Sequence, residues 1–110
     1  MAQEKLVFKI KADFLKSLAH PARLEIIEYL KTRESSVGEM VKRLGIEQSA
    51  LSKHLALLKQ SGILRSRQEK VMVFYTIRDK DIFNVLRPIS EILRKKLTES
   101  GRILAHLGRL

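Results

Sequence analysis

The sequence contains no cysteine, no long apolar run and comparatively few acidic residues. Without cysteine the chain can form no disulfide, no thiolate-ligated zinc site and no cysteine-based redox sensor. No apolar run approaches the roughly 20 residues that a membrane-spanning helix requires, and residues 1–9 lack the apolar core of a signal peptide. We therefore expect a cytoplasmic protein that does not enter a membrane.

Groups that could build a catalytic site are also scarce. The three histidines, His20, His54 and His106, lie in separate segments, and the chain has no glycine-rich phosphate loop. His20 stands beside Pro21, where it is expected to cap or pack against the start of a helix. The sequence therefore predicts neither an enzyme nor a bound cofactor.

Positive charge is what the chain has in excess. Its 22 lysines and arginines against 12 acidic residues give a formal net charge of +10. A surface of this potential favours a polyanionic partner, because binding phosphates releases their counterions. The excess is largest in residues 36–78, with eight basic residues against three acidic ones. The 110 residues are enough for one domain with a modest core, and we predict a single domain over 1–110.

Three helices are predicted before residue 46 from apolar residues at steps of three and four. The first covers 1–19, and the second begins at Pro21 and ends around 31–34. The third begins at Ser36, where Ser36 and Glu39 fit a capping box, and Gly45 is placed to end it in a left-handed conformation. The first helix has an apolar stripe of Leu6, Val7, Ile10, Phe14 and Leu18. The inward residues of the second and third helices are Leu24, Ile27 and Leu30, then Val37, Met40, Val41 and Leu44.

A fourth helix is predicted over residues 47–60, with Gly62 after it. Leu51, Leu55 and Leu58 share one side at about 100° per residue. The opposite side is polar and small. In a major groove, Gln pairs with adenine and Ser with several bases, so this side suits DNA reading. The pattern fits an ordinary solvated face equally well. The polar side contains Gln48, Ser49, Ser52, Lys53, Ala56 and Lys59.

Two short β-rich segments follow, 64–67 and 71–77, and they predict a hairpin. Four basic residues lie in it or beside it. This basic rim could lie along a phosphate backbone or in a minor groove, or it could protect a solvated strand edge from pairing. The four residues are Arg65, Arg67, Lys70 and Arg78.

Helical patterning returns over 79–110, and Pro88 either kinks one long helix or starts another. A terminal apolar stripe of this length is expected to pack on a partner helix. Lys96 and Ser100 interrupt the stripe, which leaves open a tail packed on its own domain. The stripe contains Ile89, Ile92, Leu93, Ile103, Leu104 and Leu107.

Four motifs, in order, resemble the ArsR/SmtB family of bacterial and archaeal winged-helix repressors over residues 14–78. The resemblance implies a mainly α fold with a small β-hairpin: a winged helix-turn-helix with N- and C-terminal dimerisation helices, 1–19 and 79–110, around a core of 20–78. It also implies a homodimer, a palindromic operator, and repression relieved by an inducer. The matching segments are LAHPARLEII at 18–27, SVGEM at 36–40, QSALSKHL at 48–55, and GIL at 62–64 with VFY at 73–75.

The resemblance also assigns site residues. His54 lies toward the buried side of its helix, so a phosphate contact or a structural hydrogen bond is expected there rather than base reading. The dimer interface implied by the first and last helices contains Leu6, Ile10, Phe14, Ile89, Ile92, Leu93, Ile103, Leu104 and Leu107. The DNA-reading positions are Gln48, Ser49, Ser52, Lys53 and His54, and the wing positions are Arg65, Arg67 and Lys70.

Departures from the family pattern limit what the chain can sense. The cysteine pair of metal-sensing members is missing around residues 35–38, and His106, Glu91 and Glu99 do not assemble the zinc ligand set of the last helix, so we predict no metal site. Glu47 stands where the family often has Ser, and it would repel a nearby phosphate. The wing turn, 68–70, lacks its usual Gly, so a wider loop is expected.

The sequence as a whole predicts a sequence-specific transcriptional regulator: a homodimeric repressor that binds a palindromic duplex through helix 47–60 and wing 64–77. The alternative is a less selective architectural protein, although coating DNA would call mainly for Lys and Arg on the reading face. A protein-interaction module is a third class, and RNA binding has little support because Phe74 and Tyr75 alternate along one strand. The sequence does not identify an effector, which would be a small molecule or a protein.

Overall fold

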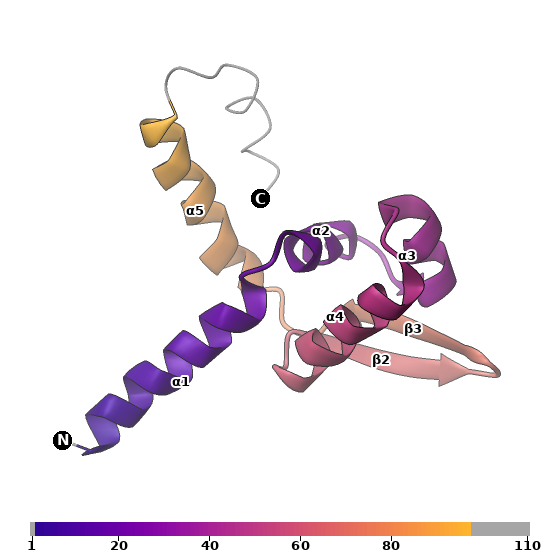
Figure 1. Ribbon diagram of the computed structural model, residues 1–110, viewed down its shortest axis with the longest axis horizontal. Helices are drawn as coiled ribbons and strands as arrows, with labels where there is room; N and C mark the ends of the chain where they lie inside the picture. The colour runs from indigo at the N-terminus through magenta and orange to yellow at the C-terminus, as the bar shows by residue number, and fades with distance from the viewer. Residues whose placement is uncertain (1, 98–110) are drawn as a thin grey trace. The chain divides into compact units, whose positions relative to one another are not determined.

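The computed structural model describes residues 2–97 and contains five helices and a three-stranded sheet (Figure 1). The chain divides into two compact units, residues 1–78 and residues 79–110, which are described separately. The elements in chain order are α1 (Ala2–Leu18), α2 (Pro21–Tyr29), β1 (Ser35–Ser36), α3 (Val37–Leu44), α4 (Gln48–Gln60), β2 (Leu64–Glu69), β3 (Met72–Ile77) and α5 (Ile82–Lys96).

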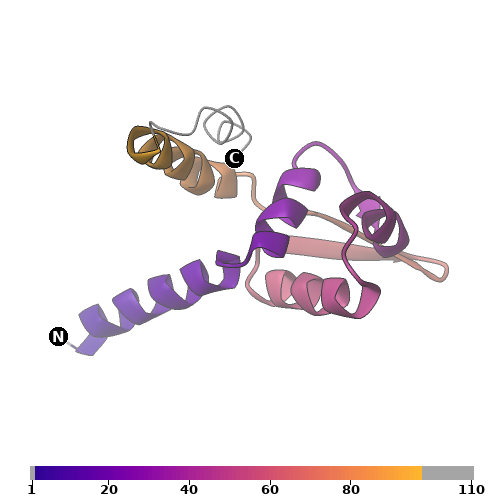
Figure 2. The same cartoon turned by 45° about the horizontal axis from the view of Figure 1, so that its top comes forward.

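The first two helices are separated by a short break. α1 ends at Leu18, and it extends away from α2, α3, α4 and the sheet in both views (Figures 1 and 2). His20 is the N-cap of α2, and its Nδ1 accepts a hydrogen bond of 3.0 Å from the amide of Ala22. The expected capping role of His20 is therefore confirmed. α2 ends at Tyr29, slightly earlier than the predicted 31–34.

α3 and α4 form the helix-turn-helix. The hydroxyl of Ser36 caps α3 by accepting from the amide of Glu39, and Gly45 ends it with a φ of 67°, both as predicted. The Glu39 carboxylate does not complete a capping box; it accepts a hydrogen bond from the Ser35 hydroxyl instead. Only three residues separate the two helices, so their relative direction is tightly set.

The core of the first unit lies between these helices and the sheet. α4 packs against α2, α3 and β2 (Figure 2). The predicted inward side of α4 is confirmed, because Leu51, Leu55 and Leu58 are fully buried. Burial of such side chains stabilises the fold by about 1.5–3 kcal/mol each. The other buried apolar residues of this unit are Leu18, Ile26, Ile27, Leu30, Met40, Ile63, Leu64 and Ile77.

The sheet has one strand more than the predicted hairpin. β1 pairs with β3 antiparallel, Ser35 opposite Tyr75 and Ser36 opposite Phe74, giving the order β1-β3-β2. No strand was predicted at residues 35–36. A two-residue strand has no periodicity for a sequence pattern to detect, and its partner is almost 40 residues away along the chain.

The turn of the hairpin differs from the sequence prediction. β2 and β3 pair in register from Leu64 opposite Ile77 to Glu69 opposite Met72, which leaves only Lys70 and Val71 in the turn. The expected wider loop over 68–70 is wrong. Lys70 adopts a φ of 58°, a left-handed conformation that Gly usually supplies in two-residue hairpin turns.

In the second unit, α5 runs through Pro88 as one helix, so Pro88 does not start a new helix. Four of its large apolar side chains are exposed: Val85, Ile89, Ile92 and Leu93. Ile103, Leu104, Leu107 and His106 lie outside the described residues. Among residues 2–97, no helix has the length and apolar character needed to span a membrane.

Candidate nucleic-acid interface

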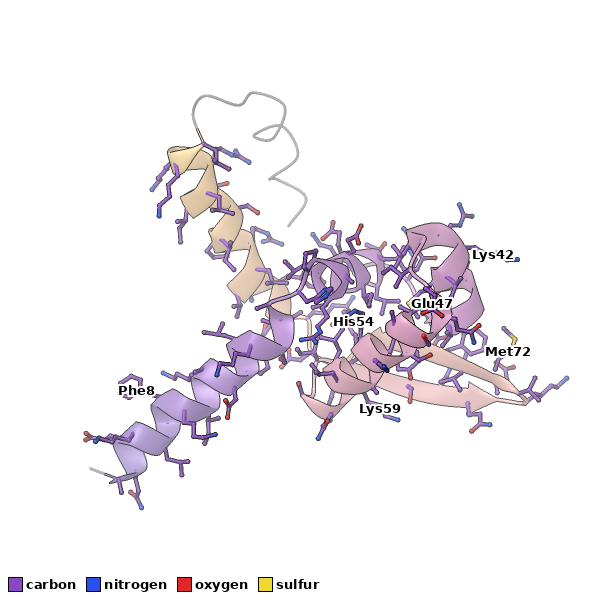
Figure 3. All side chains as sticks on the ribbon, viewed as in Figure 1. Phe8, Lys42, Glu47, His54, Lys59 and Met72 are labelled. Atoms are coloured by element: carbon purple, nitrogen blue, oxygen red, sulfur yellow. The ribbon has the colours of Figure 1, made fainter. Side chains whose placement is uncertain are left out.

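α4 offers an exposed polar surface that begins beside its buried leucines at the first turn and continues on the opposite side of the helix. Gln48, Ser49, Ser52 and Lys53 are all exposed, as are Ala56 and Lys59 farther along the same side. Glu47 and Lys59 mark the two ends of the helix in Figure 3. The anchoring of Leu51, Leu55 and Leu58 in the core fixes the direction of this surface. We call the set Gln48, Ser49, Ser52 and Lys53 the reading face.

A carboxylate closes the first turn of α4. Glu47 is the N-cap: its side chain accepts from the amides of Ser49 (3.0 Å) and Ala50 (3.1 Å) and from the Ser49 hydroxyl (2.5 Å). The hydrogen bonds from Ser49, followed by that from Ala50, lower the pKa of Glu47. The negative charge of Glu47 is thus fixed beside the reading face. Its carboxylate also accepts the hydrogen bond that the Ser49 hydroxyl can donate. Ser49 is left with an acceptor for a DNA base.

His54 does not belong to the reading face. It is half-buried, and its Nδ1 accepts a hydrogen bond of 3.2 Å from Nε of Arg23 on α2. Its ring lies 4.4 Å from that of His20, on the side of α4 that faces α2 (Figure 3). The structural hydrogen bond expected for His54 is therefore confirmed, and its phosphate contact stays a prediction.

The hairpin residue Arg67 is held by intramolecular ion pairs. Its Nε and one terminal nitrogen bind the Glu34 carboxylate at 2.9 and 2.6 Å, and the other terminal nitrogen binds Glu69 at 2.9 Å. The guanidinium also lies over the ring of Phe74, its partner in the β2–β3 register, 4.6 Å from the centroid. These hydrogen bonds raise the pKa of Arg67 and, from Arg67, lower that of Glu34. Three of the five N–H donors of Arg67 are therefore engaged, and two carboxylates neutralise its charge in this arrangement.

Arg65 and Lys70 are the predicted wing residues that remain available. Arg65 is exposed and makes one long hydrogen bond, 3.4 Å, from Nε to the Thr76 hydroxyl. Lys70 is exposed in the turn. Beside it, Val71 is 94% exposed and Met72 is 48% exposed, so the tip of the hairpin is apolar as well as basic (Figure 3).

Residues predicted for a dimer interface are exposed apolar side chains wherever the structure describes them. Leu6, Ile10 and Phe14 are exposed on α1, and so are Val7, Phe8 and Leu15. On α5 the exposed members of the predicted set are Ile89, Ile92 and Leu93. Exposure of this kind is compatible with an interface.

Sequence reasoning missed the parts of the site that depend on distant contacts. Glu34 fixes Arg67 from 33 residues away, and Arg23 reaches His54 across 31 residues. Neither pair leaves a periodic trace in the sequence. Within residues 2–97, no three His, Asp or Glu side chains gather in a way that could hold a metal ion.

Comparison with known proteins gives this geometry a context. The family model of the bacterial regulatory proteins of the arsR family matches residues 20–66. The HTH-type transcriptional regulator Rv0081 of Mycobacterium tuberculosis is 36% identical over 102 residues, which cover 92% of this chain and 90% of the relative.

Solved structures agree with the sequence matches. The crystal structure of M. tuberculosis Rv0081 gives a TM-score of 0.76 at 37% identity, covering 84% of this chain and 94% of the other. NolR from Sinorhizobium fredii gives 0.77 at 30% identity, covering 84% and 92%. The transcriptional repressor BigR from Xylella fastidiosa gives 0.65 at 35%, covering 80% and 89%. The chain therefore belongs to the ArsR family, and it is a winged helix-turn-helix DNA-binding regulator of transcription, not an enzyme.

Proposed function

We propose that the protein is a homodimeric repressor that binds a palindromic operator through α4 and the β2–β3 hairpin. The observation that carries the proposal is the reading face, which is exposed and polar while the leucines behind it are fully buried. Among its relatives, BigR is named a transcriptional repressor. In this proposal Gln48 and Ser52 contact base edges in the major groove, and Lys53 contacts bases or phosphates.

In this proposal the β2–β3 hairpin binds the phosphate backbone. Arg65 and Lys70 supply its free positive charge, whereas Arg67 keeps the hairpin in place through Glu34 and Glu69. Phosphate contacts set the register and orientation of a protein on a duplex, and base contacts give the specificity. In this proposal Lys70, exposed at the tip, makes one of the phosphate contacts that set the register.

The surface of α1 supports the homodimer. At about 100° per residue, its exposed apolar side chains span roughly 200° of the helix circumference, twice the width of an ordinary core-facing stripe. One neighbouring element cannot cover such a surface. A second copy of the chain, adding its own α1 and α5, would cover it, and two-fold symmetry would place two reading faces on a palindrome. The side chains are Leu6, Val7, Phe8, Ile10, Phe14 and Leu15.

We propose that the protein acts in the cytoplasm, where it has access to DNA. Any effector that relieves its repression acts through groups other than thiols, because the chain contains no cysteine.

A charge reversal on the reading face tests the proposal. Lys53→Glu and Ser52→Glu are expected to abolish specific binding to a duplex enriched from a random pool, measured by fluorescence anisotropy, because each places a carboxylate against DNA. Both positions are exposed, so the thermal unfolding midpoint should change little.

Lys5→Glu is the matched control. It makes the same change in net charge as Lys53→Glu, but on the charged side of α1, so it should retain nearly all of the specific affinity. Unchanged affinity in both reading-face variants would refute the assignment of α4. Equal losses in Lys5→Glu and Lys53→Glu would show that net charge, not the reading face, controls binding.

A further inference from the structure

The guanidinium of Arg23 connects its own helix, α2, to both α1 and α4. Arg23 on α2 donates from Nε to Nδ1 of His54 on α4 at 3.2 Å. One of its terminal nitrogens donates to the carbonyl oxygens of Lys16 (3.3 Å) and Ser17 (3.2 Å) near the end of α1. With His20, whose ring lies against that of His54, these groups form what we call the Arg23 junction. It links α1 directly to the helix that carries the reading face.

The junction requires neutral imidazole rings. Nδ1 of His54 accepts from Arg23, and Nδ1 of His20 accepts from the amide of Ala22. A neutral imidazole can accept at one nitrogen, whereas both nitrogens of an imidazolium are donors. Protonation of His54 would therefore turn an N–H toward the guanidinium, and protonation of His20 would remove the cap of α2.

The surroundings of His54 oppose its protonation. Burial, then the nearby His20 and Arg23, lower the pKa of His54. These two are the charged or titratable side chains that act on it; α1 contributes only the carbonyl oxygens bound by Arg23. Of the described residues in α3 and β2, which also pack on α4, none adds a charge that shifts this pKa.

We propose that Arg23 is a positioning residue for DNA binding, that it holds α4 through neutral His54, and that protonation of His54 releases this hold and weakens operator binding. The inference rests on the proposed operator-binding function. His54 directly follows Ser52 and Lys53 in the helix, so a change in its anchoring rotates or shifts the side chains on the reading face. A small displacement is enough, since base-edge contacts depend on bidentate geometry.

The sign of the effect separates this role from a simple charge effect. A surface histidine that gains a proton adds positive charge and tightens binding to DNA. Loss of the junction has the opposite effect on the specific duplex. The lowered pKa also means that the contribution of neutral His54 to stability is present above about pH 6.5, its unfolded value, and is lost as the pH falls through the folded value.

The test compares specific and random duplexes at about pH 7.5 and about pH 5.5, the range in which histidine titrates. Full-length wild-type protein is titrated by anisotropy with the duplex enriched from a random pool and with a scrambled duplex of equal length. Acidification is expected to reduce specific affinity by up to about fivefold, because a histidine whose pKa is lowered and falls by one further unit on binding is only partly protonated at about pH 5.5. Affinity for the scrambled duplex should stay equal or increase.

Two variants locate the effect. The double variant His20→Asn, His54→Asn keeps an acceptor oxygen near each Nδ1 position, and Asn is a favoured N-cap. Because neither Asn titrates, the ratio of its specific affinities at the two pH values should be close to one. Arg23→Lys keeps the charge but not the forked donor geometry, and it should bind weakly at both pH values. His106→Asn, which removes the third histidine, should retain the wild-type response.

The outcomes are distinguishable. Specific binding that tightens or stays constant on acidification would overturn the inference while leaving the proposed function intact, as would a pH response unchanged in the double Asn variant. If Arg23→Lys fails to fold, the double variant still decides the question. Absence of binding to every duplex at both pH values would overturn the proposed function, and with it the inference.

Discussion

Lys70 has two opposed effects, one on the fold and one on the proposed DNA contact. Its φ of 58° is unfavourable for a residue with a Cβ, by about 1 kcal/mol. Lys70→Gly should therefore raise the free energy of unfolding by up to about 1 kcal/mol in urea titrations. It also removes a proposed phosphate contact, so the slope of log affinity against log salt should fall by about one.

Lys70→Asn is the matched comparison, because Asn tolerates the left-handed conformation better than Lys and removes the same charge. It should show an intermediate stability and the same reduced slope. A turn that gains no stability in the Gly variant, together with an unchanged slope, would contradict both roles of Lys70.

Arg67 illustrates a basic residue whose charge is used inside the protein. Arg67→Gln should leave the salt slope of DNA binding close to the wild-type value, because the charge of Arg67 is already paired with the carboxylates of Glu34 and Glu69. A slope that falls as far as in Lys70→Gly would show instead that Arg67 leaves its partners to bind phosphate.

The same substitution has a consequence for acid stability. Arg67 lowers the pKa of Glu34 in the folded protein, so the pair contributes stability above the unfolded pKa of Glu34, about 4.3. That contribution is lost as the pH falls through the lowered folded value. Arg67→Gln should therefore lose less stability than wild type between about pH 6 and pH 3. Identical pH profiles by thermal unfolding would contradict the ion pair.

At the scale of the element, α4 carries an acid at the end that approaches DNA. Glu47→Ser keeps a favourable N-cap and removes the negative charge, so DNA affinity should rise, and more at low than at high salt. Glu25→Ser makes the same change in charge at an exposed position of α2 and should have a smaller effect. If both variants gain equally, the position of Glu47 beside the reading face has no influence on binding.

The elements also show how far the sequence predicts the structure. The period of Leu51, Leu55 and Leu58 is a local property, and it predicts both α4 and the direction of its reading face. Ser36 and Gly45 mark the ends of α3 because capping depends on one or two neighbouring residues. The β-rich segments 64–67 and 71–77 likewise predict the hairpin, and the family resemblance identified it as a wing.

Other features were out of reach because they depend on contacts between distant residues. β1 is formed by its pairing with β3. The β2–β3 register leaves two residues for the turn, and Lys70 therefore adopts a left-handed conformation that a residue with a Cβ disfavours. The ion pair of Glu34 with Arg67 likewise requires the folded sheet. Such features also give predicted site residues structural partners: the exposed Arg67 pairs with Glu34, and the half-buried His54 accepts a hydrogen bond from Arg23.

At the scale of the whole molecule, the proposed dimer depends on apolar surfaces of α1 and α5. Leu93→Lys should convert the dimer to monomers in sedimentation equilibrium, because it places an ammonium in an apolar interface. Asn84→Lys adds the same charge on the opposite side of α5, about 180° around the helix from Leu93, and this variant should remain dimeric. A wild-type sedimentation mass for the Leu93 variant would exclude this part of α5 from the interface.

Selection of bound sequences from a random duplex pool at near-physiological salt tests the central claim most directly. The proposed homodimer predicts enrichment of an inverted repeat with half-sites about one helical turn apart, matching the two reading faces. Tight binding without enrichment would contradict sequence-specific regulation and indicate an architectural protein, and absence of binding would contradict DNA as the partner of this surface.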